Sequence, residues 1–183
     1  MKHKMLIALG LIVFGWAVFA AVPAEAINGS GSYYATPSWD QTIITPIRFI
    51  VLTNMNSEAV LDKETGLVWE QASSTDTKNW VDAHSHCNGM KKGNRMGWRL
   101  PTLQELESLV DPSRINPALP NGHPFSNVQS SVYWSSTTYA AMTTSPGYAW
   151  LVHFHNGDVG YGNKGNSGMY VRCVRGGQGV DPQ

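Results

Sequence analysis

The chain has 183 residues, 14% of them charged, with 13 Lys and Arg against 13 Asp and Glu and a formal net charge of zero. A neutral chain has no global field to attract nucleic acid, and so low a charged content argues against a disordered acidic or basic protein. The 18 Gly and 10 Pro are too few and too scattered for collagen. These counts predict one globular domain behind an N-terminal targeting segment.

The first residues have the pattern of an export signal. Lys2 and Lys4 lie in a short basic start, Met5–Val22 is continuously apolar, and Ala24-Glu25-Ala26 has the small-x-small pattern of a cleavage site. We expect cleavage after Ala26, with the same segment kept as a membrane anchor as the alternative. The predicted organisation is a signal peptide over 1–26, a flexible leader over 27–47, a domain over 48–177 and a tail over 178–183.

Two cysteines, Cys87 and Cys173, remain after processing. An exported chain meets an oxidising compartment, where a lone pair of cysteines most often forms a disulfide. The alternatives are a free buried thiol and a metal ligand. The expected location is the periplasm, the cell surface or the medium.

The N-terminal half predicts strands and then two helices. Ile43–Leu52 carries Pro46 and suits an extended edge piece, and the runs Ala59–Asp62 and Leu67–Glu70 around Gly66 suit a hairpin. Trp80, Ala83 and Cys87 form the stripe of a helix, with Thr77 or Asp76 as its cap and Gly89 or Gly93 at its end. Thr102 and Glu105 predict a capping box for a second helix, which buries Leu103, Leu106, Leu109 and Val110 and stops at Asp111-Pro112.

The C-terminal third predicts antiparallel strands after a long irregular loop over Pro112–Ser131. The expected strands are Val132–Thr138, Ala149–His155, a return strand over Asp158–Gly162 after the Asn156-Gly157 turn, and a closing strand over Met169–Arg175 that carries Cys173. In the second strand, Trp150, Val152 and Phe154 alternate with Leu151, His153 and His155. The order predicts an α+β fold, with two helices packed on a twisted antiparallel sheet.

Four motifs in this order resemble a known family: Thr65-Gly66-Leu67-Val68-Trp69, Gly97-Trp98-Arg99-Leu100-Pro101-Thr102, Tyr133-Trp134-Ser135-Ser136 and Val171-Arg172-Cys173-Val174-Arg175-Gly176-Gly177. The chain looks like the C-terminal domain of the Legionella collagen-like adhesin, a bacterial secreted domain of largely uncharacterised function. The resemblance covers about Arg48–Gly177. It implies a C-type lectin-like fold, more distantly similar to formylglycine-generating enzymes, and the disulfide Cys87–Cys173.

The chain departs from these relatives in ways that limit what carries over. It lacks collagen repeats, so trimerisation and multivalent avidity are not implied. Its two cysteines are committed to a bridge, which leaves none for the copper-binding pair of the formylglycine-generating enzymes. The calcium and sugar triplets of classical C-type lectins, Glu-Pro-Asn, Gln-Pro-Asp and Trp-Asn-Asp, are absent from the sequence. We expect no cofactor, and a structural calcium ion stays an open alternative.

Polar residues with possible chemistry do not form a catalytic set in the sequence. His153 and His155 on a strand and His84 and His86 on a helix could be imagined as metal ligands, but their spacing places no third ligand. No Gly-x-Ser-x-Gly elbow occurs, and Glu105 is explained by the capping box. The basic cluster Lys91, Lys92, Arg95 and Arg99 could touch sulfated glycans, although a solvated loop with Arg99 in a structural ion pair is favoured. We therefore assign no catalytic and no metal-binding residue.

Aromatic residues divide into a predicted core and a predicted surface. Trp69, Trp80, Trp98, Trp134 and Trp150 follow apolar stripes or family motifs and are expected to pack in the core. Rings and polar groups at strand ends and hairpin loops have the composition of a recognition surface, with ordinary loop polarity as the alternative. The candidate ligand-binding residues are Tyr139, Tyr148, Asp158, Tyr161, Asn163, Lys164 and Asn166.

Together these patterns predict an exported, non-catalytic binding or adhesion module. Its ligand would be a glycan or protein of a cell surface or envelope, bound on the face of the loops 117–125, 139–148 and 161–166. The alternatives are a structural component of a surface assembly and a metal-dependent enzyme. No membrane span is expected after signal cleavage.

Overall fold

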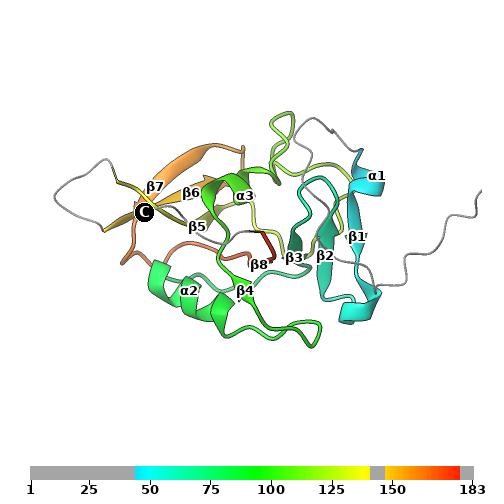
Figure 1. Cartoon of the computed structure of the whole chain (residues 1–183). Helices are drawn as coiled ribbons and strands as arrows, with labels where there is room; N and C mark the ends of the chain where they lie inside the picture. Colours follow the sequence, from blue (N-terminus) through cyan, green and yellow to red (C-terminus); the bar gives the residue numbers. More distant parts are fainter. Residues whose placement is uncertain (1–43, 141–146, 178–183) are drawn as a thin grey trace, which may run out of the picture. The chain divides into compact units, whose positions relative to one another are not determined.

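The computed structural model describes residues 44–140 and 147–177 (Figure 1). The predicted signal peptide, leader residues 27–43, residues 141–146 of one predicted binding loop and the predicted tail lie outside the described residues. The elements are α1 (Thr45–Arg48), β1 (Phe49–Val51), η1 (Thr53–Met55), β2 (Ala59–Asp62), β3 (Val68–Glu70), α2 (Trp80–Asn88), β4 (Trp98–Arg99), α3 (Leu103–Glu107), β5 (Val132–Thr138), β6 (Tyr148–His153), β7 (Val159–Asn163) and β8 (Val174–Arg175). No helix in the described ranges is long and apolar enough to span a membrane.

The first sheet has five strands in the order β1-β2-β3-β8-β4, all paired antiparallel. The predicted hairpin forms β2 and β3, and Gly66 between them takes a positive φ of 72°. β1 is an edge strand as expected, but Pro46 lies in the helical turn α1 that precedes it. The prediction of an extended segment was therefore wrong for Thr45–Arg48. Proline is tolerated near the start of a helix, because the amide groups of the first turn have no partner within the helix.

The second sheet contains β5, β6 and β7, so the expectation of a single sheet was wrong. The Asn156-Gly157 turn joins β6 to β7 as predicted, with Gly157 at a φ of 86°. The predicted closing strand is divided between the sheets: Tyr170 bridges Tyr133, whereas Val174 pairs with Trp69 and Arg99. The end of this segment is held to the first sheet by two bonds, in which the Glu70 amide donates to the Cys173 carbonyl and the Cys173 amide donates to Glu70 Oε1.

The two longer helices begin at side-chain caps. Asn79, and not Thr77 or Asp76, caps α2, and its Oδ1 accepts from the Asp82 amide at 2.8 Å. The cap lies late because the Lys78 amide is still bonded to the Met169 carbonyl in an extended bridge. At α3 the predicted capping box of Thr102 and Glu105 is present. This helix ends at Glu107, earlier than predicted.

The core consists of two clusters of buried residues that lie on opposite faces of β6. Ala149 and Leu151 belong to the cluster around the disulfide, and Val152 and Phe154 belong to the cluster that contains Leu106 and Leu109. Residues i and i+2 of a strand share a face, so β6 is covered on both sides over part of its length. The described chain is thus α+β, with antiparallel sheets, few helices and one disulfide.

Candidate functional site

Four aromatic rings meet at the end of the second sheet, and we call Tyr139, Tyr148, Trp150 and Tyr161 the aromatic surface. Tyr148 and Trp150 lie on β6, Tyr161 lies opposite Trp150 on β7, and Tyr139 directly follows β5. The rings of Tyr139 and Tyr161 are stacked, with centroids 4.3 Å apart and planes 6° from parallel. The Tyr139 ring meets Trp150 edge-on at 4.8 Å. The four rings therefore support one another.

The aromatic surface is open to solvent. Tyr161 is 49% exposed, and the other three rings are half-buried. The Tyr139 amide donates to the Tyr148 carbonyl at 2.9 Å, which holds the two strand ends together. Aromatic side chains have few rotatable bonds, so an ordered group of them presents contact area at low entropic cost.

Sequence reasoning found the three tyrosines of this surface and missed Trp150. The prediction that Trp150 packs in the core was wrong, since the ring is half-buried and belongs to neither core cluster. A signal for it was present, because Trp150 follows Tyr148 by two residues and a strand places both on one face. Trp69, Trp98 and Trp134 are buried as expected, and Trp80 packs partly buried against the core.

Of the other predicted ligand-binding residues, Asn163 lies beside the rings, because it pairs with Tyr148 across the sheet and follows Tyr161 by two residues on β7. The Lys164 ammonium lies over the Trp80 ring of α2 at 4.0 Å and donates to Thr138 Oγ1 at 3.0 Å. Asn163 and Asn166 shape the turn after β7, where their Oδ1 atoms accept from the Gly165 and Gly168 amides. Asp158 lies beyond the opposite end of β7, in the turn with Asn156. The structure thus groups the rings with Asn163, whereas the Lys164 ammonium lies over Trp80 and Asp158 lies at the other end of β7.

Three histidines are half-buried: His84 and His86 on α2, and His123 in the loop before β5. Burial lowers the pKa of His84, with a smaller contribution from the nearby Lys164. Burial also lowers the pKa of His86 and of His123, where Arg172 adds to the effect. Nε2 of His84 and of His86 and Nδ1 of His123 are buried without a hydrogen-bond partner in the described part of the chain. These side chains are therefore neutral near pH 7.

We expect the free energy of unfolding to fall as the pH drops below about 6.5. The pKa values of these histidines are lower in the folded protein than in the unfolded chain. As the pH falls, the unfolded chain therefore takes up protons first, and stability decreases until the pH lies below the folded-state pKa values as well. Urea denaturation between about pH 7.5 and about pH 5.5 measures this slope. His84→Gln should flatten it, whereas His155→Gln at an exposed position should not. A stability that stays constant over this range would contradict the prediction.

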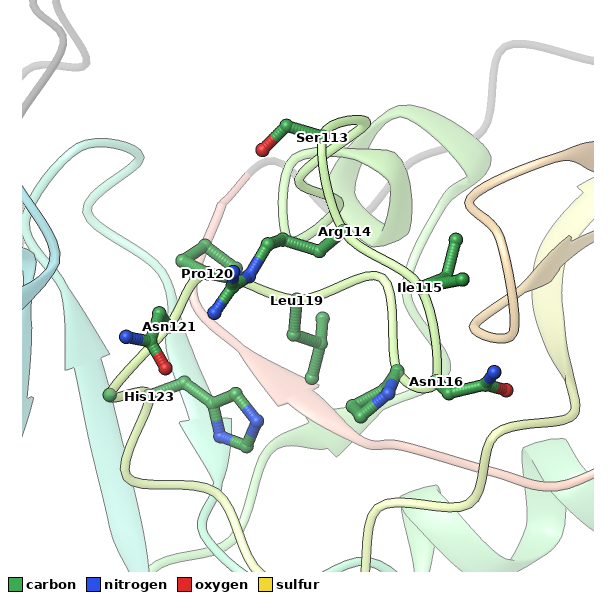
Figure 2. A pocket seen from close by; sticks show the side chains of 10 residues that line it. Ser113, Arg114, Ile115, Asn116, Leu119, Pro120, Asn121 and His123 are labelled. Atoms are coloured by element: carbon green, nitrogen blue, oxygen red, sulfur yellow. The ribbon is translucent and has the colours of Figure 1, made fainter.

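A pocket of about 430 Å³ opens in the long loop before β5, within and just before the predicted binding loop 117–125 (Figure 2). Arg114, Asn121 and His123 supply polar groups, and Leu119 and Pro120 supply buried apolar ones. Residues lining the pocket are Ser113, Arg114, Ile115, Asn116, Pro117, Leu119, Pro120, Asn121, Gly122 and His123. Sequence reasoning marked this loop but named none of these residues as a site.

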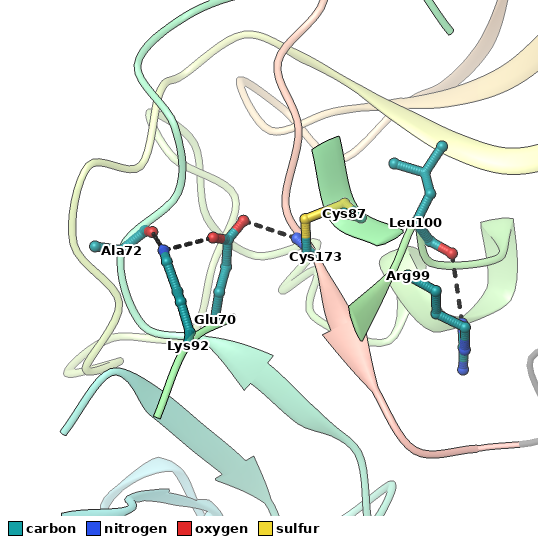
Figure 3. Close-up of a disulfide and its surroundings, with 7 residues drawn as sticks. All are labelled: Glu70, Ala72, Cys87, Lys92, Arg99, Leu100 and Cys173. Atoms are coloured by element: carbon teal, nitrogen blue, oxygen red, sulfur yellow. Dashed lines mark hydrogen bonds and ion pairs between the residues drawn. A yellow bond between two sulfur atoms is a disulfide. The ribbon is translucent and has the colours of Figure 1, made fainter. Parts of the chain in front are cut away.

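The disulfide joins Cys87 of α2 to Cys173, as predicted, and lies beside a buried carboxylate (Figure 3). Glu70 is fully buried; its Oε1 accepts from the Cys173 amide at 2.7 Å, and its Oε2 pairs with the Lys92 ammonium at 2.8 Å. Lys92 is therefore not part of a solvated loop. The expected ion pair of Arg99 is confirmed, because its guanidinium binds both carboxylate oxygens of Glu105 at 2.6 and 2.7 Å. Lys91 and Arg95 are exposed.

Ionisable groups in the described ranges form no cluster of three or more His, Cys, Asp or Glu that could hold a metal ion. His155 is exposed in the turn after β6, outside the strand predicted for it, and His153 is the half-buried last residue of β6. Their spacing therefore carries no metal assignment.

Comparison with known proteins agrees with the four sequence motifs. No curated protein matches the chain. The model of the Lcl C-terminal domain matches residues 58–175, which run from just before β2 to the end of β8 and include the aromatic surface, the pocket and both cysteines. The match spans more than half of the 183 residues and confirms the resemblance. The chain belongs to the Lcl C-terminal domain family.

Proposed function

We propose that this domain is a non-catalytic recognition module that binds a surface glycan or protein through its aromatic surface. The observation that carries the proposal is the stack of Tyr139 and Tyr161, because a half-exposed ring is held flat by a second ring and by Trp150. An aromatic side chain that only packs in the core would be buried and not half-exposed. A rigid, exposed aromatic group is instead the usual composition of a binding hot spot.

The shape and charge of the surface favour a glycan over a protein. The face of an aromatic ring carries the negative part of its quadrupole and attracts the weakly positive C–H groups of a sugar ring. The Tyr161 ring has one face on Tyr139 and is 49% exposed, which leaves area for such a contact. A protein partner could use the same rings, and a binding screen against both glycans and envelope proteins separates the two.

The absence of a catalytic role is part of the proposal, and the structural use of the polar side chains supports it. The Ser135 hydroxyl donates to the Trp150 carbonyl at 2.8 Å inside the sheet. Glu105 caps α3 and forms an ion pair with Arg99, so its carboxylate already has structural partners and is not available as a catalytic acid or base. A metal-dependent enzyme and a purely structural component of a surface assembly are the competing hypotheses.

We also infer a C-type lectin-like fold and an extracytoplasmic location. The two helices, the long irregular loop and a disulfide from α2 to the segment before the last strand support the fold. Family membership and the oxidised cysteine pair support export to the periplasm, the cell surface or the medium. A calcium ion would be an addition to this proposal, so binding is to be measured with and without it.

Tyr161→Ala tests the proposed surface. We expect ligand affinity to fall about tenfold or more, which corresponds to a hot-spot loss of about 1.4 kcal/mol or more. The free energy of unfolding should change by less than about 1 kcal/mol, because the ring is half-exposed. Affinity is measured by calorimetry on the purified, oxidised protein, and stability is measured by urea denaturation.

Val159→Ala is the matched control, since Val159 lies two residues earlier on the same face of β7 and is 38% exposed. It should keep wild-type affinity. Tyr161→Phe should keep most of the affinity if the ring face makes the contact. Equal affinities for the wild type and Tyr161→Ala would reject this site.

A further inference from the structure

The pocket in the loop before β5 has one fixed charge. Arg114 is exposed, and its guanidinium makes no hydrogen bond or ion pair with any residue that the structure describes. The nearest carboxylate in sequence, Asp111, accepts from the amide and hydroxyl of Ser113 at 3.0 and 2.6 Å. These bonds lower the pKa of Asp111, and Arg114 adds a smaller effect. No acidic residue lines the pocket.

The walls of the pocket are held in place by the protein core. The Asn116 amide donates to the His155 carbonyl and the Ala118 amide to the Phe154 carbonyl, both at 2.8 Å. The Ala118 carbonyl accepts in turn from the Asp111 amide at 3.0 Å. These bonds join the loop to the turn after β6 and to the segment after α3. They restrain the backbone that lines the pocket, which reduces the entropic cost of binding.

Polar and apolar groups of the pocket lie on different parts of its wall. Figure 2 shows the Arg114 side chain extending toward the arm of the loop that carries Pro120 and Asn121. Leu119 and Pro120 are buried, so the apolar groups that a ligand can reach are those of Ile115, which is 69% exposed, and of Pro117, which is half-buried. His123 is neutral near pH 7 and adds no second charge. The pocket thus combines one cation with a few accessible apolar groups, in a volume of the size that small-molecule sites have.

We propose that this pocket binds a carboxylate group attached to a compact apolar body, with Arg114 pairing with the carboxylate. A guanidinium presents two parallel N–H donors that match the two oxygens of a carboxylate. The Asn121 amide can donate a further bond, and Ile115 and Pro117 can contact the apolar part of the ligand. This site is separate from the aromatic surface, so the proposal does not rest on the proposed function.

Two sources offer this chemistry: a free branched or short aliphatic acid, and the C-terminal carboxylate of a peptide that ends in an apolar residue. Butyrate represents the first source, and N-acetylvaline represents the second. Butyramide and N-acetylvalinamide are neutral matches of the same shape. Each probe is titrated into the exported, oxidised protein labelled with nitrogen-15, and the amide signals of residues 113–123 are followed.

We expect saturable shifts of these amide signals with at least one carboxylate and none with its neutral match. The probe that saturates at the lower concentration identifies the source. Arg114→Gln should weaken binding about tenfold, because it removes a charge-assisted hydrogen bond. Arg114→Lys keeps the charge without the fork and should weaken binding less. Arg95→Gln removes the same charge from an exposed position in the turn after α2 and should bind as the wild type does.

Three results would overturn the proposal. The first is a lack of saturable shifts in residues 113–123 with both carboxylates. The second is equal affinity of the wild type and Arg114→Gln. The third is an equal loss in Arg114→Gln and Arg95→Gln, which would show a general effect of net charge. Folding of each variant is checked by the dispersion of the signals outside the loop.

Discussion

Replacing Cys87 and Cys173 together by alanine is expected to lower the free energy of unfolding by about 4 kcal/mol. The bridge closes a loop with a sequence separation of 86, and opening so long a loop gives the unfolded chain much additional entropy. Both side chains are fully buried in one core cluster, so the loss of sulfur also removes packing. A small domain has about 5–15 kcal/mol in total, and the variant should therefore unfold at a much lower urea concentration.

Ser85→Ala on the exposed face of α2 is the control for a substitution in this helix, and it should change the free energy of unfolding by less than about 0.5 kcal/mol. Reducing the wild-type protein should reproduce most of the effect of the double variant. If the double variant and the wild type denature at the same urea concentration, the disulfide does not stabilise the fold as described.

Glu70→Ala is expected to lower the free energy of unfolding by about 3–5 kcal/mol, because it removes a fully buried carboxylate that lies near the fully buried Arg172. The Cys173 amide would lose its acceptor, and the Lys92 ammonium would lose its ion pair. Arg172 is fully buried beside it; its guanidinium donates to the Glu70 carbonyl at 2.9 Å and to Ser73 Oγ at 2.6 Å. The Glu70 carboxylate raises the pKa of Arg172 against the larger lowering by burial. The Glu70 carboxylate therefore supplies the negative charge that lies near the two cations Lys92 and Arg172.

Glu70→Gln separates charge from hydrogen bonding, since the amide oxygen can still accept from Cys173 while the charge is lost. The free energy of unfolding of Glu70→Gln should lie between that of the wild type and that of Glu70→Ala. Glu107→Gln, at an exposed position in α3, is the matched control and should be close to neutral. Denaturation curves for Glu70→Ala and Glu70→Gln that coincide with that of the wild type would show that this buried network is not needed for stability.

Local features of the fold were predictable because their signals lie within a few residues of one another. The hairpin around Gly66, the capping box of Thr102 and Glu105, and the Asn156-Gly157 turn all depend on spacings of two to four residues. The single pairing of Cys87 with Cys173 followed from the count of cysteines and the expected compartment. The family match supports the order of the four motifs.

The features that were missed depend on contacts between distant parts of the chain. Arg172 and Glu70 are 102 positions apart, and nothing near either residue indicates that both charges are buried. The division of the closing strand between two sheets follows from the bonds of Cys173 to Glu70, which are also long-range. The cap of α2 moved to Asn79 because Lys78 pairs with Met169.

The sequence indicated that a surface rich in tyrosine exists, but it did not show which residues belong to that surface. Tyrosines at strand ends indicated a recognition surface, and three of them do meet. Lys164 was grouped with them because it is near in sequence, but its side chain lies over Trp80. Trp150 was left out because its apolar stripe also contains Val152 and Phe154, which are buried. The stripe crosses from the core to the surface within one strand, and only the packing against α3 shows where it does so.

The most direct test of the proposed function is a binding screen of the oxidised protein against surface glycans and envelope proteins, with and without calcium. We expect a saturable ligand whose binding is lost in Tyr161→Ala and kept in Val159→Ala, and the titrations with calcium show whether an ion takes part. A ligand bound equally well by Tyr161→Ala would place recognition elsewhere on the domain. The absence of any ligand, with one envelope protein copurifying, would contradict the recognition module and favour a structural role in an assembly.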